Sequence, residues 1–205
     1  MQLFLRQIVN SIFKSNTFVL YQENNQSIWL IDAGNVDEII QWSNSEDKRI
    51  TGVFITHAHF DHIYGLNKLL EYNKHLKVYI GKDDVLALYS SKMNMSRYHD
   101  EGAFEYVGEN VIGVQDGDCI ELFDEISLKV ISVPGHTPGC VAYAIQEYIF
   151  TGDAYIPGFD VVTLLPRANK AIAKESWQKI DSILHQDTLV LCAGHGDIVI
   201  SNQLV

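Results

Sequence analysis

The sequence has no long apolar run. Its apolar stretches, such as residues 50–56 and 128–133, have the length of strands and fall far short of the roughly 20 residues of a membrane helix. The first residues alternate apolar and polar side chains, with Arg6 early, and lack the pattern of a secretory signal peptide. We therefore expect no membrane partner and a strand at the N-terminus.

Cysteine is scarce. Cys119, Cys140 and Cys192 are an odd number with no close pairing motif, and a disulfide framework is unusual in a chain of 205 residues. This pattern indicates a reducing compartment, and we expect a cytoplasmic protein.

Basic residues are also few: the sequence has 15 of them and 26 acidic residues, which gives a formal net charge of -11. Such a balance disfavours a nucleic-acid backbone or an anionic membrane surface as partner. We expect a small-molecule substrate and no nucleic acid. The length suits a single domain over residues 1–205, and a homodimer stays open.

The apolar patterning predicts strands interrupted by helices. Segments rich in Val, Ile, Phe and Tyr predict strands at about 2–9, 17–22, 27–32, 50–56, 127–133, 139–145, 148–151 and 188–192. Periodicity predicts helices at about 36–44, 63–73, 83–92 and 171–185. Residues 83–126 are the least regular stretch, and such a segment often covers an active site. The order of elements predicts an α/β (α+β) fold with two packed sheets and helices outside.

A cluster of metal-ligand residue types follows the apolar strand 50–55. His57 and His59 are two positions apart, so in an extended turn their imidazoles point the same way and can hold one metal. Asp61 and His62 lie where the chain bends toward a helix and can face a second point nearby. The alternative is that Asp61 caps the helix and the histidines are surface residues.

Three more such residues stand at strand ends. His136 sits at the tip of the turn 134–139, which is fixed by proline and glycine, and an ordinary hairpin turn is the alternative. Asp153 follows the apolar residues 148–150, and His195 lies between two glycines after the apolar residues 189–191. Five imidazoles and two carboxylates without cysteine suit Zn(II), Fe or Mn in a catalytic site better than a closed structural zinc site.

In the order and spacing of these residues the sequence resembles the metallo-β-lactamase superfamily over nearly the whole chain. The resemblance implies a four-layer αβ/βα sandwich, the metallo-β-lactamase fold. It also implies that Asp32, in the segment 30–34, braces a ligand loop, with a strand-ending turn residue as the alternative. The implied ligands are His57, His59 and His136 for one metal, Asp61, His62 and His195 for a second, and Asp153 as a bridge.

The pair Asp61 and His62 and the turn 134–139 look like the glyoxalase II (hydroxyacylglutathione hydrolase) branch, whose members hydrolyse thioesters. True β-lactamases usually carry a cysteine ligand that this sequence lacks. The sequence ends ten residues after His195, so we do not expect the helical extension that binds glutathione in classical glyoxalase II. Residues 155–170 also lack the Gly-Arg-x-Asp signature common to short glyoxalase-like proteins and persulfide dioxygenases. The substrate stays open among small thioesters, esters and lactones.

Donor set and resemblance together predict a hydrolase with two divalent metal ions, Zn(II) first and Fe or Mn as alternatives. A metal-bound hydroxide would attack the carbonyl, and Asp61, the predicted catalytic residue, would orient it and relay a proton. The predicted substrate contacts are the irregular stretch around Tyr98 and four residues after Asp153, namely Tyr155, Phe159, Arg167 and Lys170. For each of them a purely structural role is the alternative.

Two other functions stay open. One is a mononuclear non-haem iron dioxygenase acting on a persulfide, with His57, His136 and Asp153 as the iron ligands. The other is a metal-binding protein without catalysis, which is disfavoured because no ligand position is lost. Metal analysis separates the hydrolase from the dioxygenase, because one iron per chain with oxygen uptake excludes the hydrolase.

Overall fold

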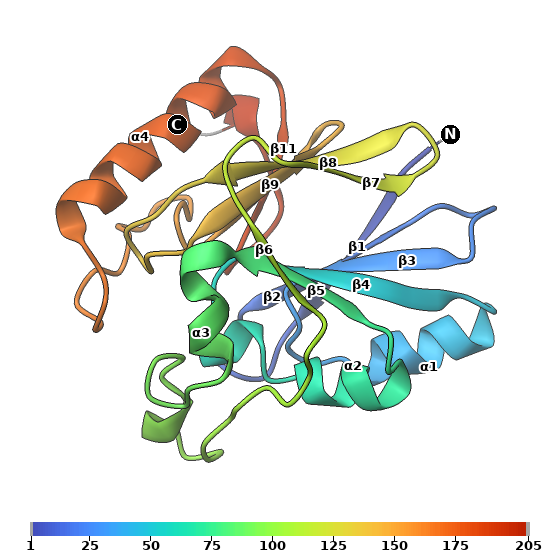
Figure 1. Cartoon of the computed structure of the whole chain (residues 1–205). Coiled ribbons are helices and arrows are strands. Elements are labelled where there is room, and N and C mark those ends of the chain that lie inside the picture. Colours follow the sequence, from blue (N-terminus) through green and yellow to red (C-terminus); the bar gives the residue numbers. More distant parts are fainter. Residues whose placement is uncertain (1, 204–205) are drawn as a thin grey trace.

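Two six-stranded mixed sheets face each other in the computed structural model, which describes residues 2–203 (Figure 1). The first sheet has the order β1 (Phe4–Val9), β2 (Asn16–Tyr21), β3 (Ser27–Ile31), β4 (Arg49–Ile55), β5 (Lys77–Gly81), β6 (Val111–Val114). The second has the order β12 (Val199–Ile200), β11 (Val190–Ala193), β10 (Tyr148–Gly152), β9 (Val141–Ile145), β8 (Ile126–Ser132), β7 (Cys119–Phe123).

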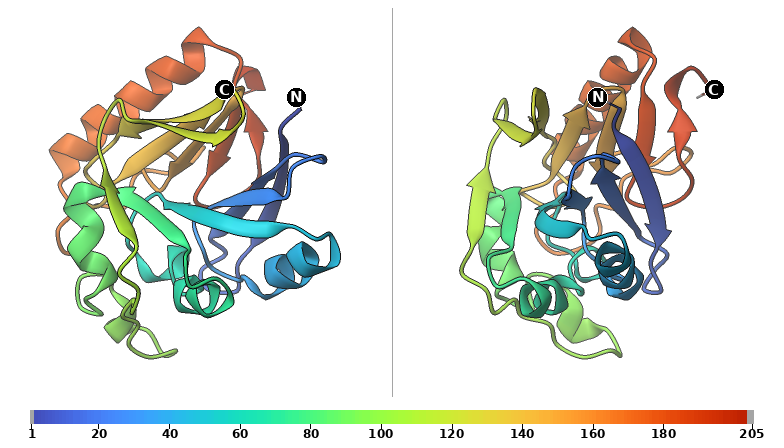
Figure 2. Two further views of the ribbon diagram at one scale, coloured as in Figure 1. Left: turned by 45° about the vertical axis from the view of Figure 1, so that its right-hand side comes forward. Right: turned by 90° about the vertical axis from the view of Figure 1, so that its right-hand side faces the viewer.

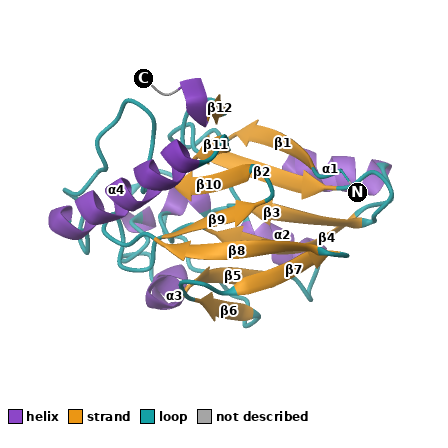
Figure 3. Cartoon of the chain, turned by 90° about the horizontal axis from the view of Figure 1, so that it is seen from above, coloured by secondary structure: helices purple, strands orange, loops and turns teal. Residues whose placement is uncertain are grey.

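The α-helices lie outside the sheets. Helix α4 (Lys170–Gln186) crosses the outer face of the second sheet, as the view from above shows (Figure 3). Helices α1 (Asp37–Ser45) and α2 (Leu66–Tyr72) stay on the outer side of the first sheet in both turned views, and α3 (Val85–Leu88) is a single turn after β5 (Figure 2). Short 3-10 turns span Phe60–His62, Lys82–Asp84, Ser96–Tyr98 and Ser201–Gln203.

Alternation along the strands divides the core into three layers. On β2, Phe18 and Leu20 face the second sheet, where they join a buried cluster with Tyr143 and Phe150. Val19, between them, belongs to the cluster under α1 and α2. A third cluster packs the outer face of the second sheet against α4. Three apolar layers separated by two sheets make a four-layer αβ/βα sandwich, and the predicted fold is confirmed.

Sheet direction places several strand ends at one edge of the sandwich. Strands β3, β4 and β5 are parallel to one another, as are β10 and β11. Segments that follow the carboxyl ends of parallel strands form a crevice at that edge, where ligands bind in open α/β sheets. Asp32 follows β3, the cluster 57–62 follows β4, Asp153 follows β10 and His195 follows β11.

The expected elements are present with shifted bounds, but four strands were missed. Of these, β6 and β7 lie inside the stretch 83–126 that we expected to be irregular, and β5 and β12 are the others. The helix predicted at 63–73 begins only at Leu66, and the one at 83–92 shrinks to Val85–Leu88 after a 3-10 turn. Among residues 2–203, no helix combines the length and apolar character that crossing a membrane requires.

Candidate metal centre

The two sheets bring all seven predicted ligand residues to one place. Their donor atoms form three overlapping groups within which all atoms lie within 4.8 Å of one another. A main-chain hydrogen bond from Val141 to the carbonyl of Thr56, 2.9 Å long, joins the two halves beneath them. The groups are His57, His59 and His136; His57, His62 and Asp153; and Asp61, His62 and His195.

The inner donor atoms face one another at short range. His59 Nδ1 lies 2.8 Å from His136 Nε2, and His62 Nε2 lies 3.2 Å from Asp61 Oδ2 and 3.4 Å from Asp153 Oδ1. His195 Nε2 is 3.5 Å from the same Asp153 oxygen. Asp153 therefore stands between the two groups of imidazoles.

Three of these atoms are buried and have no hydrogen-bond partner within residues 2–203: His57 Nε2, His62 Nε2 and Asp153 Oδ1. Burying a polar atom without a partner costs about 1–3 kcal/mol, so such atoms call for an explanation. All three point into the groups of donors. A nitrogen and oxygen donor set of this kind fits divalent metal ions.

The outer ring nitrogens are held as they are in metal-binding histidines, whose second nitrogen bonds a carboxylate or a carbonyl. His62 Nδ1 is 2.8 Å from Asp32 Oδ2, and His136 Nδ1 is 2.7 Å from the Val162 carbonyl. His195 Nδ1 is 3.1 Å from the Phe13 carbonyl. These bonds orient the rings and leave the inner nitrogens free to bind a metal.

Asp32 connects two strand ends. It accepts hydrogen bonds from the Thr56 main-chain nitrogen at 2.8 Å and hydroxyl at 2.9 Å as well as facing His62. Thr56 Oγ1 in turn lies 3.1 Å from His57 Nδ1. One carboxylate thus braces the segment that carries the first cluster of predicted ligands.

Burial favours the neutral imidazoles of His57 and His59. Burial, together with the charge of His62, holds the pKa of His57 well below its usual 6.5. Burial, together with His136, lowers the pKa of His59 to about 3. Neutral imidazoles keep a lone pair that can bind a metal.

The two carboxylates have lowered pKa values, whereas those of His62 and His195 are raised. Burial alone would raise the pKa of Asp61 and of Asp153, but the nearby imidazoles of His62 and His195 outweigh it and lower both. Burial opposes the protonated form of His195, yet the nearby carboxylates of Asp153 and Asp61 raise its pKa to about 9. The site without metal therefore holds ionised carboxylates that a cation would attract.

Glycine is required where Asp153 meets the His195 loop. A Cβ on Gly194 would lie 2.2 Å from Asp153 Oδ1 and 3.0 Å from His62 Cε1. Since no side chain fits such a gap, Gly194 lets the backbone pass directly behind two predicted ligands.

Sequence reasoning missed Asp84, which was placed inside an expected helix. Its carboxylate is fully buried and accepts hydrogen bonds from the Ala58 nitrogen at 3.3 Å and from the Thr137 hydroxyl. Ala58 lies between His57 and His59, and Thr137 follows His136. Asp84 therefore joins two ligand segments, and its position after the parallel strand β5 was the available signal.

A cavity of about 320 Å³ opens in front of the donors. Tyr98 and His99, from the stretch 83–126 predicted to cover the site, are part of its wall, and so is Phe13, which sequence reasoning did not identify. The full lining is Phe13, His59, Phe60, Asp61, Met95, Tyr98, His99, His136, Asp153, Val162, Leu165 and His195.

None of the four residues predicted to contact substrate after Asp153 belongs to this lining. Tyr155 is buried and stacks on Trp177 of α4. Arg167 pairs with Asp84 at 3.1 Å, Lys170 begins α4, and Phe159 is exposed. The geometry gives Tyr155 and Arg167 a structural role instead.

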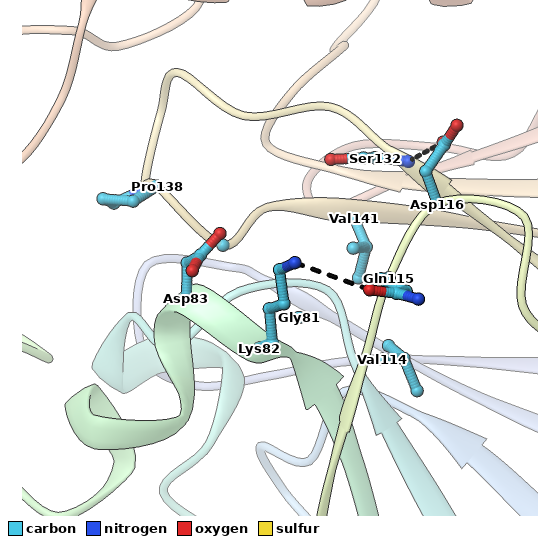
Figure 4. Close-up of a pocket in the computed structure, with 10 residues that line it drawn as sticks. Gly81, Lys82, Asp83, Val114, Gln115, Asp116, Ser132, Pro138 and Val141 are labelled. Atoms are coloured by element: carbon cyan, nitrogen blue, oxygen red, sulfur yellow. Dashed lines mark hydrogen bonds between the residues drawn. The ribbon is translucent and has the colours of Figure 1, made fainter.

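A second hollow, of about 240 Å³, lies beyond the turn at Pro138 (Figure 4). Its polar side chains satisfy local groups, since Lys82 Nζ approaches Gln115 Oε1 at 3.4 Å and Asp116 accepts from the Ser132 nitrogen at 2.6 Å. It contains none of the seven predicted ligands. Of these two cavities, only the first is lined by predicted metal ligands.

Comparison with known proteins agrees with this geometry. The model of the metallo-beta-lactamase superfamily matches residues 12–195, and the chain belongs to that superfamily. The hydroxyacylglutathione hydrolase of Buchnera aphidicola is 32% identical over 183 residues, which cover 89% of this chain and 63% of that protein. The chain spans about half to two thirds of the length of the curated hydroxyacylglutathione hydrolases it matches.

Solved structures share the fold. The BLEG-1 B3 metallo-β-lactamase superposes with a TM-score of 0.86 at 22% identity, covering 98% of this chain and 95% of that one. A protein solved in a di-iron-bound form superposes with a TM-score of 0.78 at 22% identity, covering 96% of this chain and 95% of the other. At these identities the likeness establishes the fold alone.

Proposed function

We propose that the protein is a metal-dependent hydrolase that holds two divalent ions and cleaves a small thioester, ester or lactone. Zn(II) is the preferred metal of this proposal. The observation that carries the proposal is the set of three overlapping donor groups with inward-facing, unpartnered atoms on His57, His62 and Asp153. Superfamily membership and the curated hydroxyacylglutathione hydrolases support a hydrolytic reaction.

Two ions account for the donors better than one. Seven donor residues exceed the four or five that a single Zn(II) takes, and Asp153 lies between the two groups. In this assignment His57, His59 and His136 would hold one ion, Asp61, His62 and His195 would hold the other, and Asp153 would serve both. When bound, such ions make water acidic enough to act as a nucleophile near neutral pH and polarise a carbonyl oxygen.

Asp61 is the residue placed to move a proton. It lines the cavity, and its Oδ2 lies 3.2 Å from His62 Nε2 and 3.4 Å from His195 Nε2. Because these neighbours lower its pKa, Asp61 is ionised and can accept a hydrogen bond that orients the attacking water. From this position it can relay a proton to the leaving sulfur or oxygen as the intermediate collapses.

Covalent catalysis by a serine, threonine or cysteine has no candidate among the residues that line the cavity. No serine, threonine or cysteine belongs to the lining of the cavity among the described residues. Burial raises the pKa of Cys140 and of Cys192, so both remain protonated, and Cys119 lies elsewhere on the surface. Water is therefore the nucleophile of the proposed reaction.

The test is elemental analysis of protein made without metal supplementation, paired with a panel of thioesters, esters and lactones. We expect about two divalent ions per chain and turnover that a chelator removes and Zn(II) restores. One iron per chain, with oxygen uptake on a persulfide and no hydrolysis, would establish the dioxygenase instead. Metal binding without turnover of any compound would contradict the enzyme.

A further inference from the structure

The cavity has two unlike sides. The inner side carries the imidazoles and carboxylates of the candidate metal centre. The outer side is apolar and comes from separate segments of the chain: Phe13 from the loop between β1 and β2, Met95 and Tyr98 from the segment after α3, and Val162 and Leu165 from the segment before α4. A ligand at the metal centre would lie against this apolar wall.

The wall is exposed to solvent. The exposed fractions are 67% for Phe13, 64% for Tyr98 and 51% for Val162. Clustered apolar side chains that stay open to water next to a polar site are typical of a ligand-binding surface. Covering them with an apolar group of a ligand would remove this surface from water.

The same residues that form the wall hold the candidate metal ligands. The main-chain carbonyl of Phe13 is bonded to His195, and that of Val162 to His136, and both residues line the cavity. The Phe60 nitrogen bonds the Asn94 carbonyl at 2.9 Å, which fixes the segment that presents Met95. The wall therefore has a set position relative to the centre.

No Lys or Arg belongs to the lining of the cavity among the described residues, whereas Asp61 and Asp153 do. Arg97 lies beside the wall, where its guanidinium covers the Tyr98 ring, 5.9 Å from the centroid. Carboxylates of a ligand are normally bound by Lys or Arg side chains, and the lining itself contains neither.

We propose that the cavity takes an uncharged thioester, ester or lactone whose apolar chain or ring lies against Phe13, Tyr98 and Val162. This assignment rests on the proposed hydrolase for the reacting group and adds the class of substrate. A substrate with free carboxylates, such as an acylated glutathione, is disfavoured.

Thioethers test the wall without turnover, because they lack the carbonyl next to sulfur at which a thioester is cleaved. We would measure the binding of S-methyl- and S-hexyl-N-acetylcysteamine and of S-hexylglutathione by calorimetry, to metal-free and Zn(II)-loaded protein. We expect the hexyl compound to bind about tenfold or more tightly than the methyl compound, since each buried methylene adds affinity. Equal binding of the two neutral probes, or tighter binding of S-hexylglutathione, would overturn the proposal.

Variants localise the effect. Phe13→Ala and Tyr98→Ala should weaken S-hexyl binding about 3-fold to 10-fold and weaken S-methyl binding less. Both side chains are largely exposed, so their loss should not unfold the protein. Leu164→Ala is the matched control, because Leu164 is 97% exposed on the segment of Val162 and does not line the cavity. Val162→Lys should shift preference toward S-hexylglutathione.

These measurements separate the two proposals. If the metal-loaded protein hydrolyses nothing but binds the hexyl probe more tightly through Phe13 and Tyr98, the hydrolase fails and the apolar wall stands. If it hydrolyses thioesters with kcat/KM and binding independent of chain length, the hydrolase stands and the apolar wall fails.

Discussion

Arg167 Nη2 donates a hydrogen bond of 3.1 Å to Oδ1 of Asp84, whose carboxylate has no solvent exposure. The two residues are 83 positions apart and join the segment before α4 to the end of β5. Through Ala58 and Thr137 the same carboxylate reaches both histidine segments of the metal centre. A buried carboxylate depends on every such donor, because its charge is costly to leave uncompensated.

Arg167→Met should therefore lower the free energy of unfolding by about 1–3 kcal/mol, the usual effect of losing a hydrogen bond to a buried charge. Urea unfolding followed by circular dichroism measures it. Asp84→Asn combined with Arg167→Met should cost less than the sum of the single changes. Lys170→Met, which removes an exposed cation of the same segment, is the control and should change little. Additive costs would show that the pair is not coupled.

Asp32→Asn should lower metal affinity about 10-fold to 100-fold. The asparagine oxygen can still accept from Thr56, but its amide would then face His62 Nδ1 and force the proton onto the inner nitrogen. A protonated inner nitrogen cannot bind a metal. Competition with a chromophoric Zn(II) chelator measures the affinity. Thr56→Val, which keeps the carboxylate, should have a smaller effect, and equal losses would contradict this tautomer argument.

The sequence predicted those parts of the site that depend on local pattern. His57 and His59 follow an apolar strand, and His136 lies in a turn fixed by proline and glycine, so their neighbours alone mark them. Two packed sheets and outer helices followed from alternation and periodicity, because burial on one face leaves that trace. The structure confirms this arrangement of two packed sheets with helices outside.

Contacts between distant segments left no such trace. Arg167 follows the strand-end aspartate in sequence and was expected to meet substrate, but packing brings it to Asp84 instead. Phe13 carries no ligand pattern, and only the fold brings it into the lining of the same cavity as Leu165. Strands β6 and β7 were missed because their half-exposed residues do not alternate clearly.

His59→Ala should abolish thioester turnover and reduce bound metal while leaving the fold intact. The three apolar clusters that stabilise the sheets contain none of the candidate ligands, so the core does not depend on the metal. Thermal unfolding of metal-free wild type and variant should give similar midpoints. Added Zn(II) should raise the midpoint of the wild type far more, because a ligand that binds the folded state stabilises it. Unfolding of the variant at all metal concentrations would refute this separation.

The affinity for Zn(II) should rise with pH between 7 and 9. His195 has its pKa raised to about 9, because the nearby carboxylates of Asp153 and Asp61 outweigh the effect of burial. Below that pH a metal must displace the proton, so the affinity gains up to about tenfold per pH unit for each proton displaced. Calorimetry at pH 7.5 in two buffers of different ionisation enthalpy counts the released protons. His195→Gln should release fewer, whereas His75→Gln, which changes an exposed histidine, should match the wild type. Zn(II) binding without proton release would rule out His195 as a ligand.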